Sequence, residues 1–350
     1  MKNLYYVLTL AVLAFVATPA AGQNHDMHGM AGMEEMHKMH GYMGRWTLDI
    51  PGGAGWLNVH HKNGYLDAEL LWMGGSVLPV ASAYEEHGKL VVTRVNNVVK
   101  ERDAMDKPLR THQVTERYEF VLGHDELVGT AYFPAANGLS TNVVRFTGMR
   151  LPALPPAPDL AAAKKGTPIN LLNGRDLTGW KIINPDHKNG FSVENGVLVN
   201  NPAQPADDPH RYHYGNLRTE QEFEDFNLKL EVNVPAGGNS GVYLRGIYEI
   251  QVVDSYGKAL DPHNMGALYS RITPSMSAEK PAGEWQTMDI TLYKHHVTVI
   301  LNGKKIIDNA PVQGVTGGAM SADESKPGPI YLQGDHDKVM YRNIVLTPLS

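Results

Sequence analysis

The fold is decided by the stretch DFNLKLEVNVPAGGNSGVYLRGIYEIQVVDS, residues 225–255. From Phe226 to Val234 every second side chain is apolar, and the residues between them are polar. This period of two is typical of a strand with one buried face. The glycines and asparagine at 237–239 predict a turn, and two further alternating strands follow it. The stretch therefore predicts antiparallel sheet and raises the question of what its polar face does.

The polar face of the two later strands carries large hydrogen-bonding groups. Opposite the apolar side chains stand Tyr243, Arg245, Glu249 and Gln251. Planar, hydrogen-bonding and stacking groups suit a sugar, which offers hydroxyl edges and an apolar C–H face. The alternative is a solvated outer sheet with cross-strand ion pairs such as Glu231 with Arg245, each contributing only about 0.2–1 kcal/mol.

Composition limits the classes of protein to consider. A chain of 350 residues is long enough for two domains with full cores. The formal net charge is -6, without long blocks of like charge, which argues against a nucleic-acid partner. The chain has no cysteine, so it has neither a disulfide nor a thiol nucleophile.

The N-terminus has the layout of a cleaved signal peptide over residues 1–22. Lys2 precedes an apolar run from Leu4 to Val16, and small residues follow at 20–22. The run is too short to span a bilayer of about 30 Å as a stable helix, and no later stretch is long and apolar enough. We therefore expect an exported protein, periplasmic or extracellular, without a membrane span.

Residues 23–43 form a tract in which methionines recur about every third residue with histidines between them. The plainer interpretation is a flexible tether between the mature N-terminus and the fold. The alternative is copper capture, because thioether and imidazole groups are suitable copper ligands.

Residues 44–151 contain short alternating strands separated by turn signals such as Asn63-Gly64. Almost no helix is predicted there, so we expect a small antiparallel β-barrel or sandwich. The opening Gly44-Arg45-Trp46 resembles the start of a lipocalin-like barrel.

A second all-β domain is predicted over residues 169–350. The proline- and alanine-rich segment 152–168 before it is a stiff, extended linker. Polar turns at Lys294-His295 and Asn302-Gly303 predict hairpins. Repeated short antiparallel strands over this length fit a two-sheet jelly roll.

Two later strands carry polar faces of the same kind. Trp285 and Thr287 share one side of their strand, and Tyr331 and Gln333 share one side of theirs. If these strands are neighbours of the 239–253 hairpin in one sheet, the combined face gathers Glu, Gln, Arg, Tyr and Trp side chains.

Ordered sequence blocks in the second domain point to a known family. The blocks are LLNGRDLTGWK (171–181), NGVLV (195–199), GNLRTEQEFEDFNLKLE (215–231), GGNSGVYLRGIYEIQVVDS (237–255), GALYS (266–270), KPAGEWQTMDI (280–290), LNG (301–303) and GPIYLQ (328–333) with YRNI (341–344). Over about residues 167–350 the sequence resembles the 3-keto-disaccharide hydrolase family, also described as 3-keto-glucoside 1,2-lyases/3-keto-2-hydroxy-glucal hydratases. The resemblance implies a concanavalin-like jelly roll and an exported enzyme of carbohydrate metabolism.

The resemblance also implies a reaction. A partner, a glucoside 3-dehydrogenase, oxidises the sugar at C3, and the new ketone makes the C2 proton acidic. A general base removes this proton, the aglycone leaves from C1, and water adds to the resulting glycal. Such a site needs a base, an acid or cation near the leaving oxygen, and a group that holds the enolate oxygen.

Under this resemblance, residue types suggest roles. Glu249 and Glu231 are the candidate bases, followed by Asp254 and His336; Arg245, Arg218 or a bound divalent cation are candidates to stabilise the oxyanion; Trp285 and Tyr269 are candidates to stack on the sugar; and Gln251, Gln333, Asn239 and Tyr243 are candidates to bind it.

Structural roles compete with several of these assignments. Glu231 can pair with a neighbouring Arg or Lys, Arg218 can bind backbone carbonyls at a strand end, and Asp254 can cap a turn. Asp335-His336-Asp337 resembles a metal corner, although three adjacent loop residues cannot all point inward.

Two other classes of function compete with the lyase. A retaining glycosidase needs two carboxylates about 5–5.5 Å apart, which on one strand means acids two or four positions apart. Gln251 stands where the second acid is wanted, and Asp254 has the wrong parity. A non-catalytic carbohydrate-binding module is the other alternative, although it has little use for a central Glu/Arg set.

Overall fold

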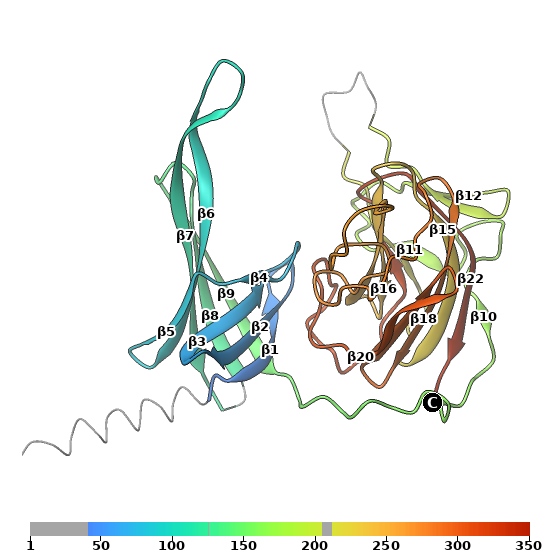
Figure 1. Ribbon diagram of the computed structural model, residues 1–350, viewed down its shortest axis with the longest axis horizontal. Helices are drawn as coiled ribbons and strands as arrows, with labels where there is room; N and C mark the ends of the chain where they lie inside the picture. Colours follow the sequence, from blue (N-terminus) through green and yellow to red (C-terminus); the bar gives the residue numbers. More distant parts are fainter. Residues whose placement is uncertain (1–40, 125, 205–211) are drawn as a thin grey trace, which may run out of the picture.

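The computed structural model describes residues 41–124, 126–204 and 212–350, and the regular structure of these residues consists of strands. The predicted signal peptide and all but the last three residues of the Met/His tract lie outside the described residues. Within the described part of the chain, no helix is long and apolar enough to cross a membrane. The strands form two bodies that lie side by side, joined by residues 151–168 (Figure 1).

The first domain is one antiparallel sheet in the order β4-β3-β2-β1-β9-β8-β7-β6-β5. Its strands are β1 (Gly44–Ile50), β2 (Gly53–Lys62), β3 (Tyr65–Leu71), β4 (Leu78–Pro79), β5 (Ser82–Glu86), β6 (Lys89–Arg102), β7 (Pro108–Leu122), β8 (Glu126–Pro134) and β9 (Thr141–Arg150). The predicted hairpin turn at Asn63-Gly64 joins β2 to β3, with φ values of 52° and 83° that suit this residue pair.

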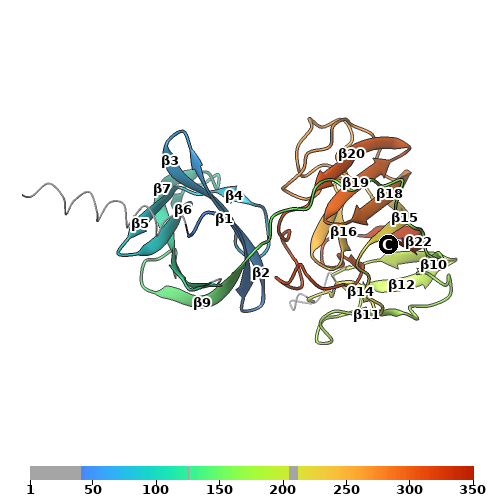
Figure 2. The same cartoon turned by 90° about the horizontal axis from the view of Figure 1, so that it is seen from below.

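The sheet of the first domain curls around a single core, so that β5 approaches β3 and the body is barrel-like (Figure 2). Trp46, Tyr118 and Phe120 are fully buried inside it. The Arg150 guanidinium lies 4.0 Å from the Trp46 ring centroid and closes one end of this core by a cation–π contact.

The second domain is a sandwich of two antiparallel sheets, as expected for a concanavalin-like jelly roll. The large sheet contains β10 (Ile169–Asn170), β12 (Phe191–Glu194), β13 (Val197–Asn200), β15 (Phe226–Asn233), β18 (Trp285–Tyr293), β19 (His296–Leu301), β20 (Lys304–Pro311) and β22 (Val339–Pro348). The small sheet has the order β11 (Trp180–Ile182), β14 (Leu217–Thr219), β21 (Tyr331–Leu332), β16 (Asn239–Leu244) and β17 (Tyr248–Val253).

The core lies between the two sheets and follows the alternation in the sequence. Phe226, Leu228, Leu230 and Val232 of β15 are buried there, as the period of two predicted. The small sheet contributes Val242, Leu244, Ile250 and Val252 from β16 and β17. Consequently the other face of the small sheet carries the polar residues of the opening stretch.

The two domains share part of this core. Ala54, Trp56 and Leu71 of the first domain belong to the same apolar cluster as the second domain. The Trp56 ring lies against the guanidinium of Arg271 at 4.0 Å, and Arg271 donates hydrogen bonds to the carbonyls of Gln313 and Val315. The first domain is therefore packed firmly against the loops that follow β17 and β20.

Candidate functional site

The site begins with a row of side chains across the outer face of the small sheet. Arg218 of β14, Tyr331 of β21, Tyr243 of β16 and Glu249 of β17 are successive partners in the strand register. Partners in register point to the same face, so these four side chains line one row. The rings of Tyr243 and Tyr331 stack with centroids 3.8 Å apart and form the middle of the row.

Glu249 is the acid of this row, and it is almost completely buried, with 4% of its surface exposed. Its side chain lies over Gly241, because a Cβ at that position would be 2.5 Å from Glu249 Oε1. Its backbone N–H donates to Thr316 Oγ1 at 2.9 Å, which ties the strand to the loop after β20. The glycine thus makes the space in which the carboxyl group lies.

The hydrogen bonds of Tyr243 favour a neutral Glu249. Tyr243 Oη lies 2.7 Å from Glu249 Oε2 and 2.6 Å from the carbonyl oxygen of Gly317. A carbonyl only accepts, and the phenol has one proton, so both contacts are satisfied when Glu249 donates to Tyr243 and Tyr243 donates to Gly317. Burial raises the pKa of Glu249 to about 8, and the nearby His336 imidazole limits the rise.

A second row, next to Glu249, presents amide groups. Gly241 is the register partner of Gln251, and the Gln333 N–H donates to the Gly241 carbonyl. The buried amide oxygens of Gln333 and Asn239 have no hydrogen-bond partner among the described residues. Buried polar atoms are usually satisfied, so these two oxygens are unused hydrogen-bond acceptors on this face of the sheet.

One wall of the site follows β21. His336 Nδ1 is 2.7 Å from Asp335 Oδ1, and this hydrogen bond raises the pKa of His336 despite its partial burial. Burial alone would raise the pKa of Asp335, but the contact with His336 lowers it. The His336 imidazole lies close enough to the Glu249 carboxyl group to lower its pKa.

The opposite wall is the segment 261–270, which pairs with the edge strand β17. The Tyr269 N–H donates to the Glu249 carbonyl at 3.0 Å, and the Gln251 N–H donates to the Ala267 carbonyl at 3.0 Å. An open pocket of about 580 Å³ lies here, lined by Asn239, Gln251, Val253, Ser255, Lys258, Ala259, Asp261, His263, Asn264 and Tyr269. Pockets of roughly 300–1,000 Å³ are typical of small-molecule sites.

The small sheet and its loops thus bring together most of the predicted sugar-binding residues. Glu249, Gln251, Tyr243, Asn239, Tyr269, Gln333 and His336 line the floor or the walls described above. Their roles toward a substrate stay predictions.

Glu231 and Trp285 lie elsewhere, so the condition that the strand of Trp285 neighbours the β16–β17 hairpin in one sheet is not met. They belong to β15 and β18 of the large sheet. Arg342 Nη2 donates to Glu231 Oε2 at 2.6 Å, and its guanidinium covers the Trp285 ring at 3.9 Å. The predicted pair of Glu231 with Arg245 is therefore replaced by a pair with Arg342. Parity gives the face of a strand but not the sheet it joins.

The three other charged candidates are engaged in structural contacts. Arg245 lies in the turn after β16 and donates to the carbonyls of Glu324, at 2.7 Å, and Lys326. Arg218 Nη2 donates to Glu222 Oε1 at 2.7 Å, although Arg218 stands at the end of the row that Tyr331, Tyr243 and Glu249 continue. Asp254 Oδ2 accepts the Gly237 N–H at 2.9 Å and holds the turn before β16.

The described residues do not fit a metal centre. No group of three or more His, Asp or Glu side chains in residues 41–124, 126–204 and 212–350 is arranged to hold a metal ion. This includes Asp335-His336-Asp337, in which Asp337 Oδ2 accepts the Asn239 N–H at 3.0 Å.

Sequence reasoning missed two residues in the wall of the pocket and a third, Ser76, behind them. Asp261 and His263 are two residues apart and hydrogen-bonded to each other, and His263 also contacts Ser76 of the first domain. The Asp-x-His spacing was visible in the sequence. The participation of Ser76 was not, because it depends on how the two domains pack.

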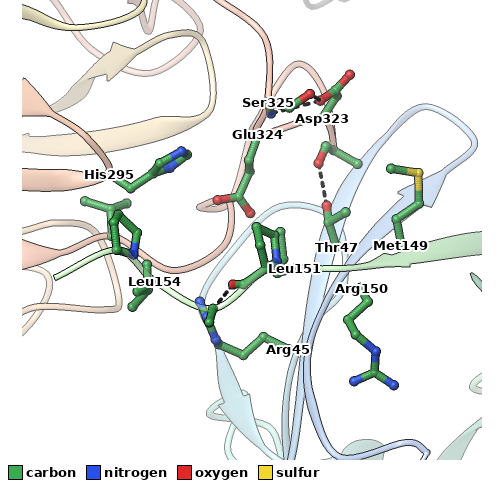
Figure 3. Close-up of a pocket in the computed structure, with 15 residues that line it drawn as sticks. Arg45, Thr47, Met149, Arg150, Leu151, Leu154, His295, Asp323, Glu324 and Ser325 are labelled. Atoms are coloured by element: carbon green, nitrogen blue, oxygen red, sulfur yellow. Dashed lines mark hydrogen bonds between the residues drawn. The ribbon is translucent and has the colours of Figure 1, made fainter. Parts of the chain in front are cut away.

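A smaller pocket of about 150 Å³ lies between the domains and beside the linker (Figure 3). Arg45, Leu151, His295 and Glu324 are among the residues around it, and Arg45 donates to the Pro152 carbonyl at 2.9 Å. This volume is below the range of roughly 300–1,000 Å³ that small-molecule sites occupy. The pocket over β16 and β17 is therefore the better candidate.

The comparison with protein families concerns the second domain. The family model described as 3-keto-alpha-glucoside-1,2-lyase-like domain matches residues 167–347. A 3-keto-disaccharide hydrolase of Bacteroides thetaiotaomicron is 26% identical over a region covering 40% of this chain and 57% of that protein. This chain therefore spans little more than half the length of that relative.

Two solved structures are also similar over about half of the chain. One is described as a putative glycosyl hydrolase from Parabacteroides distasonis, with 27% identity, 56% of this chain and 93% of that chain covered, and a TM-score of 0.42. The other is an endo-beta-1,3(4)-glucanase, with 13% identity, 56% and 92% coverage, and a TM-score of 0.34.

The fold and the site define a two-sheet jelly roll whose small sheet carries a buried acid among aromatic and amide side chains. The chain belongs to the family of the 3-keto-alpha-glucoside-1,2-lyase-like domain.

Proposed function

We propose that this chain is a carbohydrate-active enzyme that cleaves 3-keto-glycosides, including 3-keto-disaccharides, by elimination and hydration. The observation that carries the proposal is the buried carboxyl of Glu249, which forms no ion pair among the described residues. The family and the name of the Bacteroides relative support the substrate class.

Glu249 is the proposed base at C2. A carboxylate whose pKa is about 8 is a stronger base than an ordinary carboxylate, and this suits a C–H proton acidified by a neighbouring ketone. Proton removal at C2 produces an enolate, and loss of the C1 substituent follows. The reaction therefore requires one strong base and no covalent nucleophile.

His336 is the proposed cation for the enolate oxygen. Its contact with Asp335 favours the imidazolium form and places positive charge near the carboxyl group of Glu249. The free amide oxygens of Gln333 and Asn239 accept hydrogen bonds from sugar hydroxyls, while Gln251 lines the same floor.

The same geometry argues against ordinary two-carboxylate hydrolysis. Gln251 occupies the next position on the face of Glu249, and the carboxyl of Asp254 is used by the Gly237 amide. A retaining glycosidase would need a second carboxylate about 5–5.5 Å from the first.

The decisive experiment offers the purified chain a 3-keto-disaccharide and the unoxidised disaccharide, and follows the absorbance of the 2-hydroxy-3-keto-glucal. We expect turnover of the oxidised sugar alone. Equal turnover of both sugars would identify a conventional glycosidase. Tight binding of either sugar without turnover would identify a binding module.

Three further proposals accompany this function. The substrate requires a glucoside 3-dehydrogenase as a functional partner, since C3 must be oxidised first. Residues 1–22 direct export, and the tract 23–43 acts as a tether or captures copper. Deletion of residues 24–43 is expected to leave turnover unchanged; a loss of turnover that added copper restores would contradict the tether.

A further inference from the structure

A hydrogen-bonded series of three polar side chains runs from the wall of the pocket, which Asp261 and His263 line, to Ser76 of the first domain behind it. Ser76 Oγ lies 2.8 Å from His263 Nε2, and His263 Nδ1 is hydrogen-bonded to Asp261 Oδ1. Asp261 also accepts the backbone N–H of His263 at 2.9 Å. These two bonds lower the pKa of the Asp261 carboxyl group, which therefore stays ionised and fixes the imidazole.

The Ser76 loop is held in place by the second domain. The Val77 N–H donates to Ser270 Oγ at 2.8 Å, and Val77 packs against the core of the second domain. Gly317 lies so close to the backbone of Gly75 that a side chain at 317 would collide with it. The Tyr269 hydroxyl lies 3.4 Å from Ser76 Oγ.

The hydrogen-bonded series Ser76–His263–Asp261 lies on a different side of the site from Glu249 and His336. His263 and Tyr269 belong to the segment that pairs with the outer edge of β17, whereas His336 follows β21 on the other side of the β16–β17 hairpin. His263 and Asp261 line the same pocket as Gln251 and Asn239. A sugar in this pocket therefore has Asp261 and His263 in its wall, and Glu249 lies two positions before Gln251 of the pocket lining on β17.

We infer that Ser76, His263 and Asp261 form a proton-transfer chain that serves the oxygen atoms of the reaction, and that the first domain completes the active site by supplying Ser76. The inference rests on the proposed function and adds to it the acid for the leaving group. Ser76 and His263 are catalytic residues in this scheme, and Asp261 is a positioning residue.

The proton balance closes over one turnover. In the elimination Glu249 takes the C2 proton and the C1–O bond breaks. The leaving oxygen receives the hydroxyl proton of Ser76, and protonated His263 donates a proton to Ser76 in its place. In the hydration a water oxygen bonds to C1 and loses a proton through Ser76 to neutral His263, while protonated Glu249 returns a proton to C2. Both groups recover their starting states.

The test measures how fast the full-length protein and its variants cleave two substrates that differ in their leaving group. A 3-keto-disaccharide expels a sugar alkoxide that must be protonated, whereas a p-nitrophenyl 3-keto-glucoside expels a phenolate that needs no proton. We expect Ser76→Ala and His263→Gln to slow cleavage of the disaccharide about 100-fold or more, in the usual range for general acid catalysis. Release of p-nitrophenolate should fall less than about 10-fold. The glycal should then accumulate, because its hydration still requires proton transfer through Ser76 and His263.

His60→Gln is the matched control, because His60 forms an Asp–His pair with Asp67 at 3.8 Å within the first domain. It should leave both rates unchanged. Equal losses for the two substrates, or unchanged rates in both variants, would overturn the proton chain while the proposed function stands. A wild-type protein that cleaves neither oxidised substrate would contradict both the proposed function and the proton-transfer role of Ser76, His263 and Asp261.

Thermal unfolding of each variant distinguishes a catalytic defect from a folding defect. If His263→Gln unfolds early, the comparison rests on Ser76→Ala, which removes a single oxygen atom. A Ser76→Ala variant with the wild-type unfolding temperature and wild-type cleavage of the disaccharide would exclude the chain.

Discussion

The Oε1 atom of Glu249 lies 2.5 Å from the position that a Cβ at Gly241 would take. The Glu249 carboxyl group thus occupies the space that a side chain at position 241 of the neighbouring strand would need. The relationship explains how a charged residue type is accommodated on a nearly closed sheet surface.

Gly241→Ala should reduce turnover about 100-fold while the protein stays folded. The new methyl group displaces the far end of a flexible side chain, which costs little stability, but it moves the proposed base out of position. Steady-state kinetics and thermal unfolding measure the two effects. Unchanged turnover would mean that the position of the Glu249 carboxyl group does not matter.

Glu249→Gln should abolish turnover and yet stabilise the protein at alkaline pH. The folded-state pKa of about 8 exceeds the ordinary value of 4.5, so the folded protein holds a proton that the unfolded chain releases between these values. Stability conferred by this proton is complete below about pH 4.5 and is lost as the pH rises through 8, by about 1.4 kcal/mol per pH unit. The amide in the variant keeps the contact with Tyr243 without this loss.

Urea unfolding of both proteins at pH 5, 7 and 9 tests this prediction. The wild-type free energy of unfolding should fall relative to that of Glu249→Gln as the pH rises. Curves that stay parallel would show that Glu249 titrates normally. The prediction concerns the difference in the free energy of unfolding between the wild type and Glu249→Gln. Burial also raises the pKa of Glu324, and this affects the stability of both proteins equally.

For the p-nitrophenyl 3-keto-glucoside, whose leaving group needs no proton, kcat/KM should rise with a midpoint near pH 8, as Glu249 ionises. His336→Gln should move this rise to higher pH, because the positively charged imidazole lowers the pKa of Glu249. A rise centred near pH 4.5 in the wild type would assign the base to another carboxylate.

Glu231→Gln should change turnover less than twofold, since Glu231 is on the large sheet. Its pair with Arg342 is partly exposed, so stability should fall by only about 0.2–1 kcal/mol. This variant is a carboxylate-to-amide control for Glu249→Gln. A severe loss of turnover would restore Glu231 as a candidate base.

Trp56→Ala should destabilise both domains together. The ring is buried between the domains and covers the Arg271 guanidinium at 4.0 Å, so its removal leaves a cavity and uncovers a buried charge. We expect a loss of about 3–5 kcal/mol. Calorimetry should show one shifted transition; a shift confined to one of two separate transitions would mean that the domains fold independently.

The sequence predicted the strands well because alternation is a local property. The apolar positions from Phe226 to Val232 are buried, and Asn302-Gly303 turns a hairpin with φ values of 50° and 79°. The polar face of Tyr243, Glu249 and Gln251 was predicted for the same reason.

The remainder of the site depends on long-range packing. The assignment of Trp285 and Glu231 to the other sheet follows from the order in which strands pair, which no local pattern contains. The raised pKa of Glu249 comes from its burial, and the residues that contact Glu249 and Tyr243 include Thr316 and Gly317, far along the chain. Ser76 lies 187 residues from His263 in the sequence, in another domain.

The shared core has a consequence for synthesis of the chain. Trp56 and Leu71 emerge from the ribosome about 200 residues before the loops that bury them, which at 5–20 residues per second is a delay of about 10–40 s. During that interval the completed first domain presents an apolar surface with no partner. Trp56 and Leu71 therefore remain exposed to solvent until the second domain packs over them.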